Sequence, residues 1–150
     1  MSILDIFSNS ILWSALLPWG LAQMIKTPLE YLTTRRWNWS LLLSSGGMPS
    51  SHSALIAGAC HAIGLRAGFS SPIYALSFVT AMIVIYDATG IRRQAGKHAA
   101  VINAIIEDMA AGQPLQQEKL REVLGHTPME ALGGTVLGLL FAQLLWMIGL

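Results

Sequence analysis

The sequence predicts an all-α integral membrane protein. We expect one bundle of about four transmembrane helices, with an amphipathic surface helix and a short helix between the third and fourth spans. Composition is the first indication: 53% of the 150 residues are hydrophobic and 11% are charged, against about a quarter charged in soluble domains. The mean hydropathy of +0.54 is the second. The length predicts a single membrane-embedded domain over residues 1–150.

Four apolar segments have the lengths expected of membrane helices. They cover about residues 3–25, 54–69, 72–88 and 129–150. The first and last reach the ~20 residues that a spanning helix needs, and the middle two lie near the lower limit of ~17. The Phe-Ser-Ser-Pro sequence at 69–72 predicts a tight turn, which makes the second and third helices antiparallel neighbours.

A polar stretch over residues 89–128 separates the third and fourth segments. Apolar residues recur in it at helical spacing, at Val101, Ile102, Ile105, Ile106 and Met109. This pattern predicts an amphipathic helix that lies on the membrane surface or caps the bundle. Residues 112–114, Gly-Gln-Pro, interrupt it, and residues 115–124 predict a short helix that ends at Gly125.

The order of spans brings the polar segments to one face of the membrane. In an up-down-up-down bundle, Lys26, residues 46–52, Asp87 with the arginines after it, and residues 126–130 all emerge at the same end. Eight of the nine basic residues lie on this face, and only Arg66 lies near the other. The positive-inside rule therefore predicts that this face is cytoplasmic and that both termini lie outside.

Residues 46–54, Gly-Gly-Met-Pro-Ser-Ser-His-Ser-Ala, combine features that suit phosphate. Glycines allow close backbone approach, and a helix start preceded by serines directs amide N–H groups at an anion. His52 could move a proton near neutral pH. Alternatively, Ser50 and Ser51 cap a helix beside an incidental histidine.

His126 and Glu130 are four residues apart and share a helical face if the helix extends back to His126. A carboxylate on one imidazole nitrogen would fix the tautomer and leave the other nitrogen to attack. Thr127-Pro128-Met129-Glu130 also reads as a capping box, and both interpretations can hold.

Other charged residues have two interpretations each. Arg92 and Arg93 either flank the third span or bind phosphate, with Asp87 orienting a guanidinium. Lys26 either extends from the helix end to the membrane surface or contacts phosphate. Trp37 and Trp39 are typical of interfacial anchors.

Several functions are not indicated. The adjacent Cys60 and His61 lack the further partners that zinc needs, so we expect neither a metal site nor a cofactor. Nothing in the charge pattern indicates nucleic-acid binding. The expected partners are the lipid bilayer and a lipid phosphate, and a homo-oligomer stays open.

Three motifs in order resemble the divergent branch of the type 2 phosphatidic acid phosphatase family, related to acid phosphatases and vanadium-dependent haloperoxidases. They are the sequence at 46–54, Tyr-Asp-Ala-Thr-Gly-Ile-Arg-Arg-Gln-Ala-Gly at 86–96, and Leu-Gly-His-Thr-Pro-Met-Glu at 124–130. The resemblance implies a metal-independent phosphohistidine mechanism. In it His126 is the nucleophile, Glu130 its orienting group, His52 the general acid, and Lys26 with Arg35 the first phosphate-binding block.

The chain departs from the superfamily pattern at several positions. Ser51 replaces a glycine, Glu130 replaces an aspartate, and Lys26 and Arg35 are two residues too far apart. Leu120 stands where an arginine is expected before His126. In a competing alignment Arg92 precedes His98, but Ile102 then occupies the position of the acid.

The resemblance implies a multi-pass membrane phosphatase, in a bacterial inner membrane or an organellar membrane. Its substrate would be an amphiphilic phosphate ester: phosphatidate, phosphatidylglycerophosphate or an isoprenoid phosphate. The alternative is a non-catalytic membrane protein that keeps the fold as a lipid-phosphate sensor or assembly factor. Haloperoxidase chemistry with bound vanadate is a third, less favoured reading.

Overall fold

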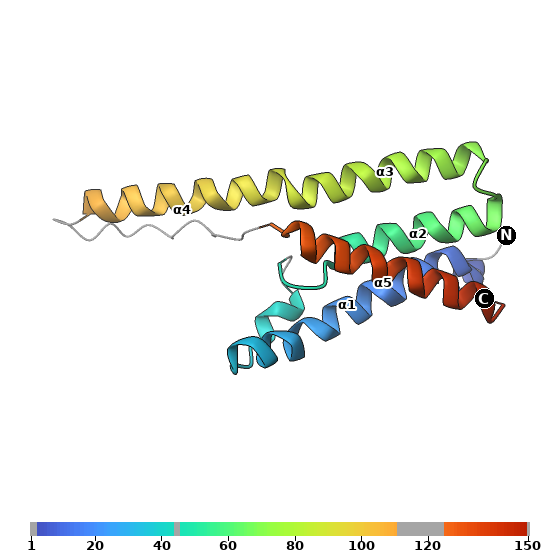
Figure 1. Ribbon diagram of the computed structural model, residues 1–150, viewed down its shortest axis with the longest axis horizontal. Helices are drawn as coiled ribbons and strands as arrows, with labels where there is room; N and C mark the ends of the chain where they lie inside the picture. The colour runs from blue at the N-terminus through green and yellow to red at the C-terminus, as the bar shows by residue number, and fades with distance from the viewer. Residues whose placement is uncertain (1–2, 44–45, 111–124, 150) are drawn as a thin grey trace.

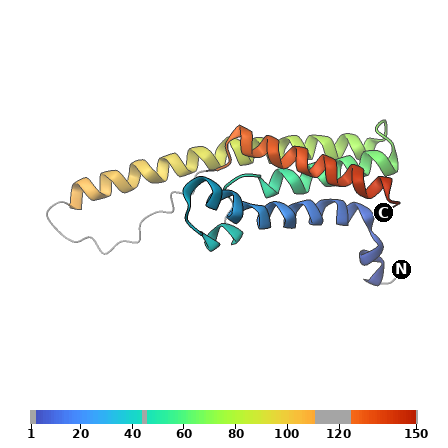
Figure 2. The same ribbon diagram turned by 60° about the horizontal axis from the view of Figure 1, so that its bottom comes forward.

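The computed structural model describes residues 3–43, 46–110 and 125–149, and the secondary structure in these ranges is helical without a strand. The predicted all-α class is confirmed. Helices α1 (Ser10–Thr34), α2 (Ser51–Ala67) and α5 (Pro128–Met147) pack together, and α3 (Pro72–Thr89) lies along α2 (Figure 1). Helix α4 (Ile91–Ala110) continues from α3 and extends past the bundle (Figure 2).

The N-terminal helix differs from its predicted bounds. A 3-10 helix, η1 (Ile3–Ser8), precedes it, and the Asn9 side chain caps α1 by accepting from the Leu12 amide at 3.1 Å. Helix α1 then continues past Lys26 to Thr34, whereas the sequence predicted an end near residue 25. Lys26 is therefore part of the helix and not the residue that follows it.

The other apolar helices begin at side-chain caps. Ser50 caps α2, Ser71 caps α3 and Thr127 caps α5, each by accepting from a backbone amide of the first turn. Such caps satisfy helix donors that have no carbonyl partner. Both parts of the predicted capping box at Thr127 and Glu130 are present. A short 3-10 helix, η2 (Trp39–Leu43), lies between α1 and α2.

The predicted amphipathic helix is present but longer and placed differently. It begins at Ile91, ten residues before Val101, and it contacts α3, from which it continues (Figure 1). The amide of Gly90 donates to Tyr86 O, and the amide of Gln94 donates to Gly90 O, so helical bonding continues across the junction. For this reason α4 projects beyond the bundle and does not cap it. The predicted helix at 115–124 lies outside the described residues.

Small residues let the three central helices approach closely. A Cβ on Gly58 of α2 would collide with the Ser14 carbonyl of α1, and a Cβ on Gly138 of α5 would collide with the Ala54 carbonyl of α2. Most of the buried apolar side chains are alanines. Helices of membrane proteins characteristically associate through such small residues, because lipid supplies no hydrophobic drive for their association.

Large apolar side chains face outward. On α3, Leu76 is 63% exposed and Ile83 is 64% exposed. Within the described ranges, two helical segments are long and apolar enough to cross a membrane, residues 72–107 and α5. Helix α2 has 17 residues, about 25 Å at 1.5 Å per residue. The count of four spans stays a prediction.

Candidate functional site

Lys26 is buried inside the bundle at the end where α2 and α5 begin. Its side chain is 1% exposed, and Nζ donates to Ser51 Oγ at 3.4 Å. Gly47, at a φ of +87° that favours glycine, lies against the Lys26 side chain.

The start of α2 supplies three buried hydroxyl groups. Ser50, Ser51 and Ser53 are each no more than 1% exposed. Ser50 Oγ accepts from the Ser53 amide at 3.3 Å and from Ser53 Oγ at 3.1 Å, so Ser50 is the helix cap. The capping alternative is confirmed for Ser50, while Ser51 contacts Lys26. The positive end of the helix dipole therefore adjoins a buried ammonium group, and this combination attracts anions.

His126 and Glu130 form the expected pair. His126 Nδ1 lies 3.0 Å from Glu130 Oε2, and His126 is 2% exposed. The same Glu130 oxygen accepts from the Thr127 amide at 3.3 Å, while Thr127 Oγ1 accepts from the Glu130 amide. One carboxylate thus caps α5 and contacts the imidazole, so the capping box and the His126–Glu130 contact are both present, and the catalytic role of the pair stays a prediction.

Backbone hydrogen bonds join the helix ends that carry these side chains. The His126 amide donates to Ala88 O at 3.0 Å, and the Ser50 amide donates to Glu130 O at 2.9 Å. The rings of His52 and His126 lie edge to face with centroids 5.9 Å apart. The predicted convergence is therefore confirmed for α1, α2, the end of α3 and α5.

One predicted substrate-binding residue, Arg35, is not brought into the cluster formed by Lys26, Ser51, His52, His126 and Glu130. Arg35 is the exposed C-cap of α1, with a φ of 58°. It lies nine residues beyond Lys26, about 13 Å along the helix. Asp87 is half-buried in the last turn of α3, next to Ala88. Arg92 and Arg93 occupy the first turn of α4, but their side chains lie outside the described part of the structure. An Asp87–arginine pair therefore stays a prediction.

The competing histidine is far from the cluster. His98 is exposed on α4, ten residues beyond Ala88 on a nearly continuous helix, or about 15 Å. It lines a shallow cleft with Tyr86 and Gln94. The arrangement favours His126 over His98 as the histidine that acts with His52.

Two polar residues of α1, the buried Thr27 and the half-buried Gln23, were missed by the sequence interpretation. Thr27 is 1% exposed, and among the described residues neither Thr27 Oγ1 nor Gln23 Oε1 has a hydrogen-bond partner. The Gln23 amide nitrogen donates to Leu42 O at 3.0 Å. Gln23, Lys26 and Thr27 are spaced i, i+3, i+4 and so share one helical face. This pattern could have been recognised if the helix had been extended past residue 25.

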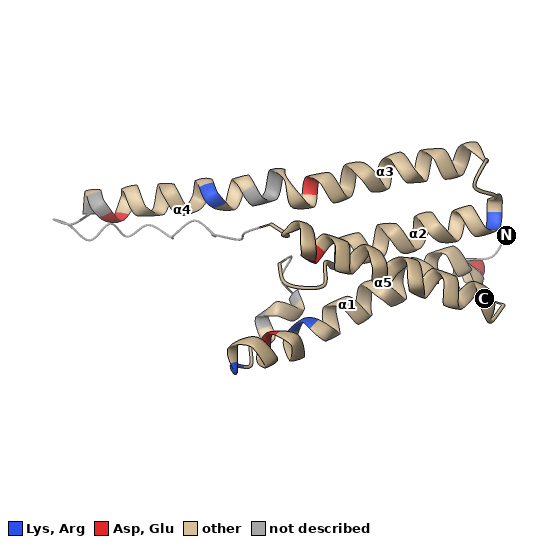
Figure 3. Cartoon of the chain, in the orientation of Figure 1, with Lys and Arg blue, Asp and Glu red and all other residues tan. Residues whose placement is uncertain are grey.

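The basic residues are unevenly distributed between the two ends of the bundle (Figure 3). Most basic residues of the described ranges lie toward the end where α4 projects, and Arg66 lies in the last turn of α2 at the other end (Figure 3). Within those ranges no three His, Cys, Asp or Glu side chains come together as metal ligands. The cluster instead combines two histidines, a carboxylate, a lysine and a helix start, the groups that phosphate chemistry without a metal uses.

An all-helical bundle with an outward apolar surface and a buried His–Glu pair at one end defines a helical membrane protein with a polar cluster at one end of its bundle. The chain belongs to the Divergent PAP2 family, whose sequence model matches residues 7–141. It is 37% identical over 153 residues to "Uncharacterized membrane protein YuiD" of Bacillus subtilis (strain 168), covering 95% of this chain and 97% of the relative. No solved structure matches the chain.

Proposed function

We propose that the protein is a membrane phosphatase that hydrolyses an amphiphilic phosphate ester through a phosphohistidine intermediate without a metal. The proposed substrate is phosphatidate, phosphatidylglycerophosphate or an isoprenoid phosphate. The observation that carries the proposal is the 3.0 Å contact of Glu130 Oε2 with Nδ1 of the buried His126, beside the His52 ring. Membership of the Divergent PAP2 family supports it.

In the first step, His126 Nε2 attacks phosphorus. Glu130 holds a proton on Nδ1, so the lone pair is on Nε2, and the carboxylate stabilises the positive charge that develops on the ring. The bond from phosphorus to the lipid oxygen breaks. Protonated His52 gives its proton to that oxygen, which leaves as the lipid alcohol.

In the second step, water attacks phosphorus of the phosphohistidine. Neutral His52 takes a proton from the water, the P–N bond breaks, and inorganic phosphate leaves. His126 returns to its neutral form and His52 is again protonated, so the cycle closes without a co-reactant.

The phosphoryl oxygens need positive charge and N–H donors. Lys26 is the ammonium group of the described cluster, and the first turn of α2 after Ser50 and Ser51 supplies the positive end of a helix dipole. We assign Arg92 and Arg93, oriented by Asp87, and Arg35 to the same substrate phosphate as further binding groups. Arg35 would have to reach from the exposed end of α1, so its contribution is the smallest.

The cluster lies at an end of the bundle, where a lipid phosphate would lie with its tail among the outward apolar side chains. By the positive-inside rule we place this end at the cytoplasmic face of a multi-pass protein. At this position a membrane protein would act on the phosphate group while the lipid tail stays in the bilayer, which a soluble enzyme would not do.

The test is phosphate release from a panel of lipid phosphates by the purified protein in EDTA. We expect the wild type to release phosphate and vanadate to inhibit it. His52→Ala and His126→Ala should each lose activity. Full activity of His126→Ala would refute the assigned mechanism.

A non-catalytic lipid-phosphate sensor or assembly factor is the second candidate, and the exposed position of Arg35 favours it. Such a protein would bind lipid phosphates through Lys26 and the start of α2 but would not turn them over. Binding that persists in His126→Ala, with no phosphate released by the wild type, would support this function over the enzyme.

A further inference from the structure

The end of the bundle opposite the candidate active site carries a cleft with a volume of about 510 Å³. Arg66, in the last turn of α2, lines it. Arg66 lies 14 residues from His52 along one helix, or roughly 21 Å. That distance places the cleft and the active-site cluster near opposite faces of a membrane about 30 Å thick.

Arg66 has an aromatic neighbour, and no carboxylate of the described residues forms an ion pair with it. Its guanidinium carbon lies 5.3 Å from the ring centroid of Trp146 on α5, a cation–π contact. No described side chain or carbonyl forms an ion pair or hydrogen bond with Arg66. The guanidinium has five N–H donors in a planar fork that matches the oxygens of a phosphate or carboxylate. Its donors are therefore available to an anion.

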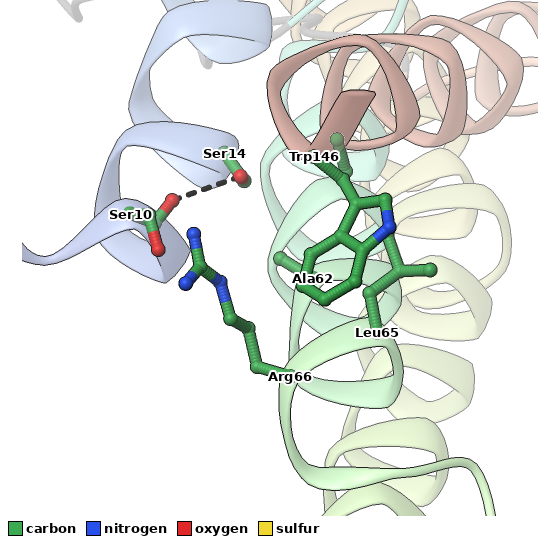
Figure 4. Close-up of a pocket in the computed structure, with 7 residues that line it drawn as sticks. Ser10, Ser14, Ala62, Leu65, Arg66 and Trp146 are labelled. Carbon is green, nitrogen blue, oxygen red and sulfur yellow. Dashed lines mark hydrogen bonds between the residues drawn. The ribbon is translucent and has the colours of Figure 1, made fainter. Parts of the chain in front are cut away.

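The start of α1 adds a second positive end. In Figure 4 the Arg66 guanidinium points toward Ser10 and Ser14 of α1. Ser10 is the first residue of that helix, and it lines the cleft together with Arg66. Ser14 Oγ is occupied by a hydrogen bond of 2.8 Å to Ser10 O. The positive end of a helix dipole and an unpaired guanidinium meet here without a neutralising carboxylate in the cleft lining.

Apart from Ser8 and Gly149, the rest of the cleft wall is apolar and aromatic. Phe7, Trp13, Leu17 and Leu145 line it. Trp13 Nε1 donates to Phe7 O at 2.8 Å, which holds the 3-10 helix η1 against α1 and forms one side of the cleft. Trp13 and Trp146 are 38% and 42% exposed. Such half-exposed tryptophans are typical of the membrane–water interface.

We propose that this cleft binds an anionic phospholipid of the leaflet opposite the candidate active site. The lipid phosphate would lie between Arg66 and the first turn of α1, and an acyl chain would lie along Leu17 and Leu145. Apolar walls distinguish this ligand from free phosphate. The lack of an acidic residue in the lining disfavours a zwitterionic headgroup, whose ammonium group would have no carboxylate partner.

The experiment is native mass spectrometry of the full-length protein, delipidated in detergent and titrated with phosphatidylglycerol. This phosphodiester is not a substrate of the proposed phosphomonoesterase, so the measurement does not depend on turnover. We expect one lipid per chain, and a dissociation constant about tenfold higher for Arg66→Gln, the loss expected for charge-assisted hydrogen bonds. His126→Ala should bind phosphatidylglycerol as the wild type does.

Arg36→Gln is the matched control, because Arg36 is an exposed arginine beyond the other end of α1. It should bind phosphatidylglycerol like the wild type. Equal binding by wild type and Arg66→Gln would overturn the proposal. Phosphatidylcholine bound as tightly as phosphatidylglycerol, or millimolar inorganic phosphate that displaces the lipid, would also overturn it. Thermal unfolding of Arg66→Gln checks that the exposed substitution leaves the fold intact.

Discussion

The Glu130 carboxylate has two roles that substitution can separate. Its Oε2 caps the Thr127 amide at 3.3 Å and holds His126 Nδ1 at 3.0 Å. Glu130→Gln keeps an oxygen acceptor for the cap, since glutamine also completes a capping box. It removes the negative charge that would stabilise a positively charged His126 ring. We expect kcat to fall by about 10²–10⁴-fold, the range for removing the orienting carboxylate of a catalytic histidine or a general acid–base group.

The reciprocal variant is Thr127→Ala. It removes the side chain that accepts from the Glu130 amide, and losing an N-cap costs about 1 kcal/mol. The unfolding temperature should therefore fall by a few degrees. The contact between His126 and Glu130 does not use the Thr127 side chain, so kcat should stay close to that of the wild type.

The assay combines phosphate release from phosphatidate and an isoprenoid phosphate with thermal unfolding in the same detergent. We expect opposite outcomes for the two variants. Glu130→Gln should lose activity without losing stability, whereas Thr127→Ala should lose stability without losing activity. If Glu130→Gln retained full activity, the carboxylate would be a cap alone. If both variants lost activity in proportion to stability, the catalytic reading of the pair would be wrong.

Three further substitutions test the packing and the phosphate-binding face. Gly138→Ala should lower the free energy of unfolding by about 1–3 kcal/mol, because its Cβ would collide with the α2 backbone. Gly20→Ala, at a position with open space around it, should not lower the free energy of unfolding, and equal effects of the two substitutions would refute this packing. Thr27→Val should raise stability by up to about 1 kcal/mol, since it removes a buried hydroxyl that has no partner among the described residues. It should also raise KM for the lipid phosphate, and unchanged kinetics would place Thr27 outside the site. Lys26→Met should lower kcat about 10²-fold, and retained activity would exclude Lys26 from phosphate binding. Thermal stability should stay the same or rise, because burying an ammonium group costs folding free energy.

Helix starts were predictable from sequence because capping is local. Ser50 and Thr127 have hydroxyls that accept from an amide three residues later, and the pattern of a capping residue before an apolar run reveals them. The i, i+4 spacing likewise gives the contact between His126 and Glu130.

Helix ends were less predictable because they depend on tertiary contacts. A lysine after an apolar run indicates the end of a span, yet α1 buries Lys26 against Ser51 and continues to Thr34. The change of composition after Ala88 indicates a helix end as well, but hydrogen bonds on both sides of Gly90 carry α3 almost directly into α4. Arg35, which the family resemblance implied as a phosphate ligand, lies away from the cluster because it is nine residues beyond Lys26 at the end of α1.

The central claim is that His126 carries the phosphoryl group during turnover. The most direct measurement is rapid quenching of the full-length protein with excess ³²P-labelled phosphatidate, followed by peptide mapping under alkaline conditions that preserve phosphohistidine. We expect a phosphoryl group on the peptide that contains His126, absent from His126→Ala. Steady release of phosphate with no label on His126, or with the label on His98, would contradict it.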